Sequence, residues 1–208
     1  MNNRQIDLKE DPRSSKAIES LRYGAGSLSL DLQATIGQRL HQPIERLSGP
    51  AKLNEWLITE GIIDQPLAIS DTDVMRMRDL REMLYRITYA VFVGVNPTDT
   101  DVDAVNRVAR PDVPGPQMAL DPTTPGRFVQ SRTSELTLEN AMTLVARDAV
   151  ELLTSERVKH LHMCEAENCA MIFIDTSHGH RRHWCSSSRC GNRVRVAAHR
   201  ARHRAQDN

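Results

Sequence analysis

Residues 164–193 read CEAENCAMIFIDTSHGHRRHWCSSSRCGNR and contain every cysteine of the chain. The cysteines form two pairs with Cys-x4-Cys spacing, Cys164 with Cys169 and Cys185 with Cys190, and fifteen residues separate the pairs. Each pair can form a chelating loop, so four thiolates can close a tetrahedron around zinc. Four protein ligands leave no open position for a reactive water. We therefore expect one structural zinc ion per chain.

Two other interpretations of the cysteines stay open. Four buried thiols without a metal are one, and an iron–sulfur cluster is the other. The first 16 residues contain no apolar run and thus no secretory signal, which predicts a cytoplasmic protein. In that reducing compartment, paired cysteines are more often metal ligands than disulfides. The longest apolar stretch, residues 89–95, is too short to span a bilayer, so we expect no membrane partner.

The residues around the cysteines predict a treble-clef-like finger. Residues 160–163 and 170–175 favour strands, and the turn-forming residues 176–179 lie after the second of them. Serines 186–188 offer helix caps, which would place Cys190 in the first turn of a C-terminal helix. Fewer than about 60 residues bury too little apolar surface to be stable alone. We therefore expect the finger to require zinc and to unfold separately from the rest of the chain.

Three residues next to the cysteines are predicted to support the metal site. Trp184 is the expected main apolar residue of the small finger. Gly191 would permit close approach of the backbone beside the metal. The Asn192 amide would hydrogen-bond a cysteine carbonyl or sulfur, because outer residues usually orient metal ligands.

The charge distribution predicts a surface for nucleic acid at the C-terminal end. Residues 157–208 hold ten Lys/Arg and four Asp/Glu, whereas residues 1–156 hold 17 and 23. On a helical wheel, Val194, Ala198, Ala201 and Ala205 share the side of Cys190 and would dock on the finger, with arginines on both flanks. Few aromatic residues accompany them, which favours duplex DNA over single strands. The candidate nucleic-acid contacts are Arg181, Arg182, Arg189, Arg193, Arg195, Arg200, Arg202 and Arg204.

The preceding residues predict a mainly helical domain with a small sheet, so the fold class is α+β. Ser70, Thr98 and Thr137 are typical helix starts, and a shorter helix is expected after Pro50. Residues 27–36 fit either a strand or a helix, with Asp31 as a cap, and a hairpin is expected around residues 118–129. The expected organisation is a loose segment at residues 1–26, a sensor or oligomerisation domain at 27–157, and the finger at 158–208.

The motifs around the cysteines closely resemble the CGNR zinc-finger family. The resemblance rests on Cys164-x4-Cys169, the sequence FID at residues 173–175, RRHWC at 181–185 and CGNR at 190–193. In that family the finger usually follows an ABATE domain, which belongs to stress-induced transcription regulators of bacteria. LSLDLQAT at residues 28–35 looks like the LxLDxxNT element of that domain, but Ala34 takes the place of the Asn. The resemblance implies a DNA-binding regulator.

We expect a zinc-finger transcription regulator that binds double-stranded DNA. Its further partners would be a small-molecule effector at the N-terminal domain and a second copy of the chain. No Gly-rich phosphate loop, nucleophile elbow or HExxH pattern occurs, so we do not expect an enzyme. The alternative is a zinc-stabilised module that binds protein or RNA and has no specific DNA site.

Overall fold

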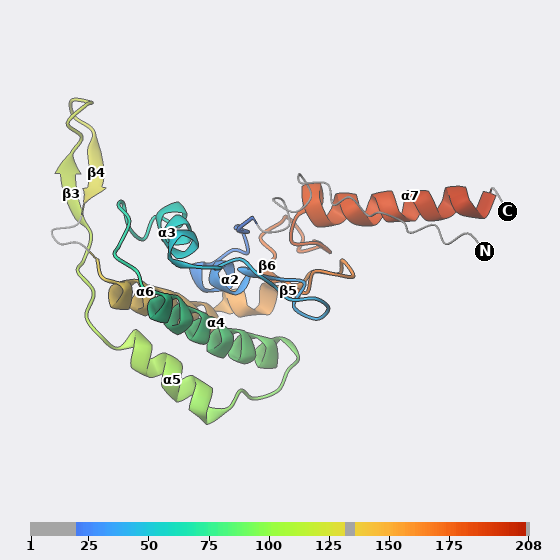
Figure 1. Cartoon of the computed structure of the whole chain (residues 1–208), viewed down its shortest axis with the longest axis horizontal. Coiled ribbons are helices and arrows are strands. Elements are labelled where there is room, and N and C mark those ends of the chain that lie inside the picture. Colours follow the sequence, from blue (N-terminus) through green and yellow to red (C-terminus); the bar gives the residue numbers. More distant parts are fainter. Residues whose placement is uncertain (1–19, 132–135, 207–208) are drawn as a thin grey trace, which may run out of the picture.

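A computed structural model describes residues 20–131 and 136–206, and of residues 130, 131 and 204–206 it describes the backbone alone. Helices form about half of the described residues, and short antiparallel hairpins lie between them (Figure 1). In chain order the elements are α2 (Leu28–Gln33), β1 (Ile36–Gly37), β2 (Ile44–Glu45), α3 (Pro50–Thr59), α4 (Asp71–Phe92), α5 (Asp99–Ala109), β3 (Gln117–Leu120), β4 (Phe128–Ser131), α6 (Leu138–Thr154), the 3-10 helix η1 (Glu156–His160), β5 (Leu161–Met163), β6 (Ile172–Ile174), the π-helical turn η2 (Ser187–Gly191) and α7 (Asn192–Gln206). The expected α+β fold class is confirmed.

Side-chain caps determine where the long helices begin. At the start of α4 the Ser70 hydroxyl accepts the Asp73 N–H, and the Asp73 carboxylate accepts the Ser70 N–H. Thr137 caps α6 in the same reciprocal way, and Thr98 caps α5. Such caps give partners to N–H groups that have none inside the helix. The three predicted helix starts are therefore confirmed.

The body core is the larger of two apolar clusters and lies between α3, α4, α5 and α6. Met77, Leu80, Leu84 and Ile87 recur along α4 at helical spacing and face this core. Among the described residues, no helix combines the length and the apolar character needed to cross a membrane. Fully or almost fully buried members of the core are Leu53, Trp56, Met77, Leu80, Leu84 and Val145.

Three two-stranded antiparallel sheets lie within the described part of the chain. The predicted hairpin is β3–β4, in which Leu120 pairs with Phe128. A second hairpin, β1–β2, follows α2, so the ambiguous residues 27–36 form a helix and then the start of a strand. The third hairpin, β5–β6, belongs to the finger and pairs Leu161 with Ile174.

The finger core is the second apolar cluster, and it includes residues of the body. Phe173, at 0% exposure, lies in it with the four cysteines, Leu161, Ile172 and Ile174. Leu30 and Ala34 of α2 and Leu152 of α6 pack into the same cluster. The neighbouring Leu32 of α2 packs into the body core instead. The two apolar cores therefore meet at α2, and the finger has no separate core, in contrast to the expectation.

Residues 20–26 belong to the packed structure, although the sequence predicted a loose segment up to residue 26. Leu21 and Ala25 are buried, and the Ala25 carbonyl accepts the N–H of Ile174 in β6 at 2.7 Å. The Asp31 carboxylate accepts the Ala25 N–H at 2.8 Å, so Asp31 has the predicted capping role. Burial raises the pKa of Asp31 to about 6, against the opposing hydrogen bonds. Residues 1–19 lie outside the described part of the chain.

We expect Leu30→Ala to destabilise the finger although it lies in the body, because its fully buried side chain fills the finger core. Truncating such a leucine costs about 2–5 kcal/mol. Trp56 lies in the body core and Trp184 packs on the finger core, so single-tryptophan variants report the two parts separately. Chemical unfolding of Leu30→Ala followed by Trp184 fluorescence should show a lower midpoint.

The matched control is Leu53→Ala, which removes an equally buried leucine from the body core alone. Its effect should be larger on the Trp56 transition than on the Trp184 transition. An unchanged Trp184 transition in Leu30→Ala would contradict the shared finger core.

Candidate metal centre and basic helix

The first cysteine pair lies in a tight loop after β5. The Cys164 N–H donates to the Met171 carbonyl, and the Cys169 N–H donates to the Ala166 carbonyl, both at 2.9 Å. Ala170 has a φ of 53°, a left-handed conformation that turns the chain into β6. This folding of the loop places the two sulfur atoms on the same side.

The second cysteine pair spans the start of the C-terminal helix. Ser186 caps the π-helical turn η2 by accepting the Arg189 N–H at 3.3 Å, and Cys190 lies inside this turn. The sequence therefore located the cap and the ligand correctly. The turn is π-helical, which sequence spacing did not predict.

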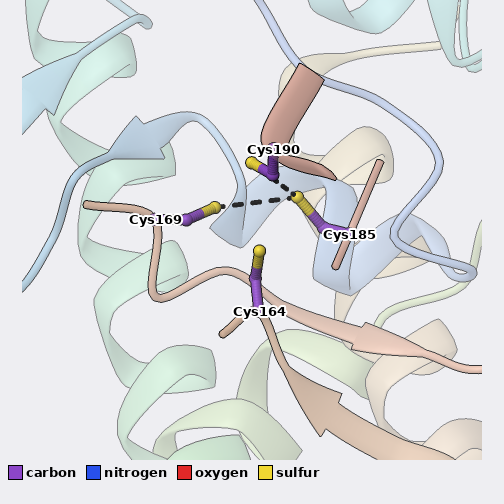
Figure 2. Close-up of side chains that lie close together, drawn as sticks. All are labelled: Cys164, Cys169, Cys185 and Cys190. Atoms are coloured by element: carbon purple, nitrogen blue, oxygen red, sulfur yellow. Dashed lines mark hydrogen bonds between the residues drawn. The ribbon is translucent and has the colours of Figure 1, made fainter. Parts of the chain in front are cut away.

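All four cysteine sulfurs converge on one point between these two loops (Figure 2). They lie within 4.8 Å of one another, and the Sγ atoms of Cys169 and Cys190 are each 3.6 Å from that of Cys185. A tetrahedral zinc site with Zn–S bonds of about 2.3 Å requires sulfurs about 3.8 Å apart. A disulfide requires about 2.05 Å. All four cysteines are buried, so the arrangement fits a closed zinc site.

The chemistry of Cys190 also suits a metal ligand. Hydrogen bonds from the other three thiols, with the nearby charge of Arg193, lower the pKa of Cys190, whereas the same shared hydrogen bonds raise the pKa of Cys164 and of Cys185. Nη2 of Arg193 lies 3.9 Å from the Cys190 sulfur. A thiolate, and not a thiol, binds zinc.

The three residues predicted to support the metal site, Trp184, Gly191 and Asn192, differ in how closely their contacts match the predicted roles. A Cβ on Gly191 would lie 3.0 Å from the Trp184 ring, so the glycine allows the indole to cover the backbone beside Cys190. Trp184 is only half-buried, and Phe173 rather than Trp184 is the central aromatic residue of the finger core. The Asn192 side chain is exposed, and its predicted hydrogen bond to a cysteine is absent among the described residues. Arg193 makes the contact to sulfur instead.

Asp175 organises the loop between the cysteine pairs, a role that the sequence analysis missed. Its buried carboxylate accepts the N–H groups of Ser177 and Arg182, both at 2.8 Å. Burial alone would raise the pKa of Asp175, but these hydrogen bonds hold it well below its usual range. The preceding Phe173-Ile174 pair fills the core, so the FID sequence links core packing to loop geometry.

Arg182 braces this loop internally. Its Nη2 donates to the Cys185 carbonyl at 2.6 Å, and its guanidinium lies 4.7 Å from the centre of the Phe173 ring. Both contacts use the head group that was predicted to bind nucleic acid. The structure thus removes Arg182 from the free basic surface and gives it a structural role.

The histidines lie outside the cysteine cluster. The rings of His160 and His180 stack with centres 3.7 Å apart, and Nδ1 of His180 contacts the Asp175 carbonyl oxygen at 2.7 Å. Nδ1 of His183 lies 2.9 Å from the Glu165 carboxylate. Among the described residues, no grouping of three or more metal-binding side chains other than the four cysteines occurs.

Helix α7 projects from the finger as a single rod (Figure 1). Val194 packs on the finger core, but Ala198 and Ala201 are exposed, so the predicted docking of the small residues extends over the first turn only. The side chains of Arg204 and Ala205 lie outside the described residues. Arg195 donates to the Ser187 carbonyl at 3.2 Å. The exposed arginines of the finger are Arg181, Arg189, Arg193, Arg195, Arg200 and Arg202.

Comparison with known families agrees with this architecture. The family model ABATE, described as "Putative stress-induced transcription regulator", matches residues 26–156. The chain belongs to the ABATE family. A second model, the CGNR zinc finger, matches residues 160–203, so the resemblance noted from the sequence is confirmed. No curated protein matches the chain.

The finger match and the sulfur geometry together decide between the interpretations of the cysteines. Four converging sulfurs do not fit unrelated buried thiols, and the CGNR match assigns a zinc finger rather than an iron–sulfur cluster. Cys164, Cys169, Cys185 and Cys190 therefore hold one structural zinc ion.

In the ABATE region (residues 26–156), Ala34 stands where the family has Asn, and it packs into the finger core. The next residue, Thr35, accepts a hydrogen bond from Arg81 at 3.0 Å.

We expect one zinc ion per chain in the purified protein, because the four sulfurs form a closed and buried site. Elemental analysis by mass spectrometry measures it. Cys185→Ser should lose the metal, whereas Ser186→Ala, which removes only a cap, should keep it. Iron with acid-labile sulfide, or reduced wild-type protein without metal, would contradict the zinc site.

Proposed function

We propose that this ABATE-family protein is a transcription regulator that binds double-stranded DNA in the cytoplasm and has no catalytic role. Residues 158–208 would form the DNA-binding finger. Residues 27–157 would receive a regulatory signal, with a small molecule as the effector. The family description supports regulation, and the charge of the finger supports DNA as the partner.

The unpaired arginines of the finger are the main support for this proposal. In the body, Arg81 pairs with Glu45 at 2.7 Å and Arg86 pairs with Asp101 at 2.5 Å. By contrast, within the described residues none of the finger arginines forms an ion pair with a carboxylate. Arginines without acidic partners keep their charge for phosphate and for bidentate contacts to bases.

The shape and aromatic content of the finger favour duplex DNA. Helix α7 has 15 residues, which corresponds to about 22 Å of length at 1.5 Å per residue. The major groove admits a helix of this kind. Single-strand binding uses exposed aromatic platforms, but Phe173 is fully buried and Trp184 covers Gly191.

The alternative is a zinc-stabilised finger that binds protein or RNA. A protein partner with an acidic face would also suit the arginines of α7. A large preference for one duplex sequence at physiological salt supports regulation of specific genes. Equal binding of RNA and of random duplex, or no nucleic-acid binding, supports the alternative.

The test of the proposal is the salt dependence of DNA binding by Arg200→Ala. Arg200 is exposed on α7 and forms no hydrogen bond or ion pair with a described residue, so its removal should leave the fold intact. One lost phosphate contact lowers the slope of log K against log salt by roughly one. Affinity should fall for specific and random duplex alike, because phosphate contacts carry little sequence information.

The control is Arg127→Ala, an exposed arginine in the turn of the β3–β4 hairpin. It should bind DNA like the wild type. If Arg200→Ala keeps both the slope and the affinity, α7 does not follow the DNA backbone and the alternative is favoured.

We further propose that a second copy of the chain binds the β3–β4 hairpin. Cross-strand partners share one face of a hairpin, so Met118, Leu120 and Phe128 form one apolar face, with 82%, 64% and 61% of their surfaces exposed. Neither strand contains a charged residue or a proline, the usual protection of an edge. An uncharged strand can pair with its own copy without repulsion. Figure 1 shows this hairpin and α7 at opposite ends of the molecule.

Leu120→Lys should convert the dimer to a monomer, because it places two like charges in the proposed interface. Sedimentation velocity at micromolar concentration measures the mass. Leu40→Lys is the matched control, since Leu40 is 61% exposed on another loop and should leave the dimer unchanged. A monomeric wild type, or a dimer that persists in Leu120→Lys, would refute this interface.

A further inference from the structure

The zinc site of the finger has a charge that the protein must compensate. Four thiolates and one Zn²⁺ carry a net charge of −2, and all four cysteines are at most 7% exposed. A buried charge is costly unless opposite charges or hydrogen-bond donors lie close to it. Arg193 and Arg46 are the cations that bear on this charge.

Arg193 reaches the site from the finger side. It lies in the first turn of α7, three residues after Cys190, and its Nη2 is 3.9 Å from the Cys190 sulfur. A guanidinium N–H at this distance is a hydrogen-bond donor to a thiolate. The last residue of the CGNR sequence is thus in contact with a zinc ligand.

Arg46 approaches the finger core from the ABATE region. It follows β2 and is only 1% exposed, and its Nη1 lies 3.5 Å from the carbonyl of Ala34, which packs in the finger core with the four cysteines. Gly37 provides the space for it, since a Cβ at that position would overlap the guanidinium. The side chain is therefore enclosed between β1, α2 and the finger.

The electrostatics of Arg46 agree with this position. Burial, and then the charge of Arg22, lower the pKa of Arg46 to about 10. The negative charge of the Cys169 thiolate acts in the opposite direction and raises it. The charge of the zinc site therefore favours the charged form of Arg46, whose guanidinium lies beside Ala34 of the finger core.

We propose that Arg46 and Arg193 compensate the charge of the zinc–thiolate site from its two sides, and that Arg46 makes the ABATE region respond to zinc. The guanidinium of Arg46 is buried beside the finger core, so it depends on the negative charge of the zinc–thiolate site as a counter-charge. Loss of the site removes this counter-charge, and the contact between the ABATE region and the finger then weakens. Linkage is reciprocal: the factor by which zinc binding strengthens the contact between the ABATE region and the finger is also the factor by which this contact strengthens zinc binding. A change in the ABATE region that moves Arg46 away should therefore lower the zinc affinity of the finger.

The experiment is a competition for zinc between the full-length protein and a chromophoric chelator. Removing an outer residue of a metal site typically costs about 10- to 100-fold in metal affinity. Arg46→Gln and Arg193→Gln should each fall in this range. Arg46→Lys keeps the charge and should recover most of the affinity that Arg46→Gln loses.

Two control variants separate compensation of charge from loss of fold. Arg86→Gln removes an exposed arginine of the body, one that pairs with Asp101, and should keep zinc affinity within about threefold of the wild type. Arg195→Gln removes the α7 arginine that contacts the Ser187 carbonyl, and it should also keep the affinity. A loss in Arg86→Gln as large as that in Arg46→Gln would overturn the proposal.

A spectroscopic readout tests the contact to sulfur directly. In the Co²⁺-loaded protein, the sulfur-to-cobalt charge-transfer band should move to lower energy in both Gln variants, because a lost positive charge makes the thiolates better electron donors.

Zinc should also raise the melting temperature reported by Trp56 in the wild type, and raise it less in Arg46→Gln. Unchanged zinc affinity and an unchanged cobalt band in Arg46→Gln would refute the role of Arg46. If Arg46→Gln does not fold, Arg46→Lys and Arg193→Gln decide, and a wild-type band in Arg193→Gln counts against the proposal.

Discussion

Helix α2 packs into two apolar cores at once, and the connection between the body and the finger depends on this packing. It has six residues, of which Leu32 packs in the body core and Leu30 in the finger core. Hydrogen bonds also link α2 to the finger through Ala25. The Asp31 carboxylate accepts the Ala25 N–H, and the Ala25 carbonyl accepts the N–H of Ile174 in β6. A short helix that is buried on two sides cannot shift without disturbing both cores. The ABATE region and the CGNR finger are therefore mechanically joined.

The two parts use their arginines in opposite ways. Several of those in the body are held by carboxylates, as in the pair of Arg86 with Asp101, which joins α4 to α5. Those of the finger either contact backbone carbonyls and sulfur, as Arg182 and Arg193 do, or extend into solvent. The neutral net charge of the chain hides this division. It is the arrangement expected of a protein that keeps a polyanion away from one part and attracts it to another.

The sequence predicted well what local patterns determine. The spacing of the cysteines indicated the metal site, and Ser70, Thr98 and Thr137 marked helix starts, because caps act within a few residues. It predicted poorly what depends on distant partners. A helical wheel shows which side of α7 carries Ala198 and Ala201, but not that nothing in the described structure covers them. Likewise, the polar composition of residues 20–26 hid the burial of Ala25, and no local pattern connects Arg46 with cysteines more than 100 residues later.

The incomplete core of the finger limits how such a protein can evolve. A finger that packs Phe173 and Ile172 against its own residues alone could move between proteins by gene fusion. This finger also needs Leu30, Ala34 and Leu152, so a transferred copy would expose apolar surface and aggregate. Successful recombination would have to carry α2 and the end of α6 with it.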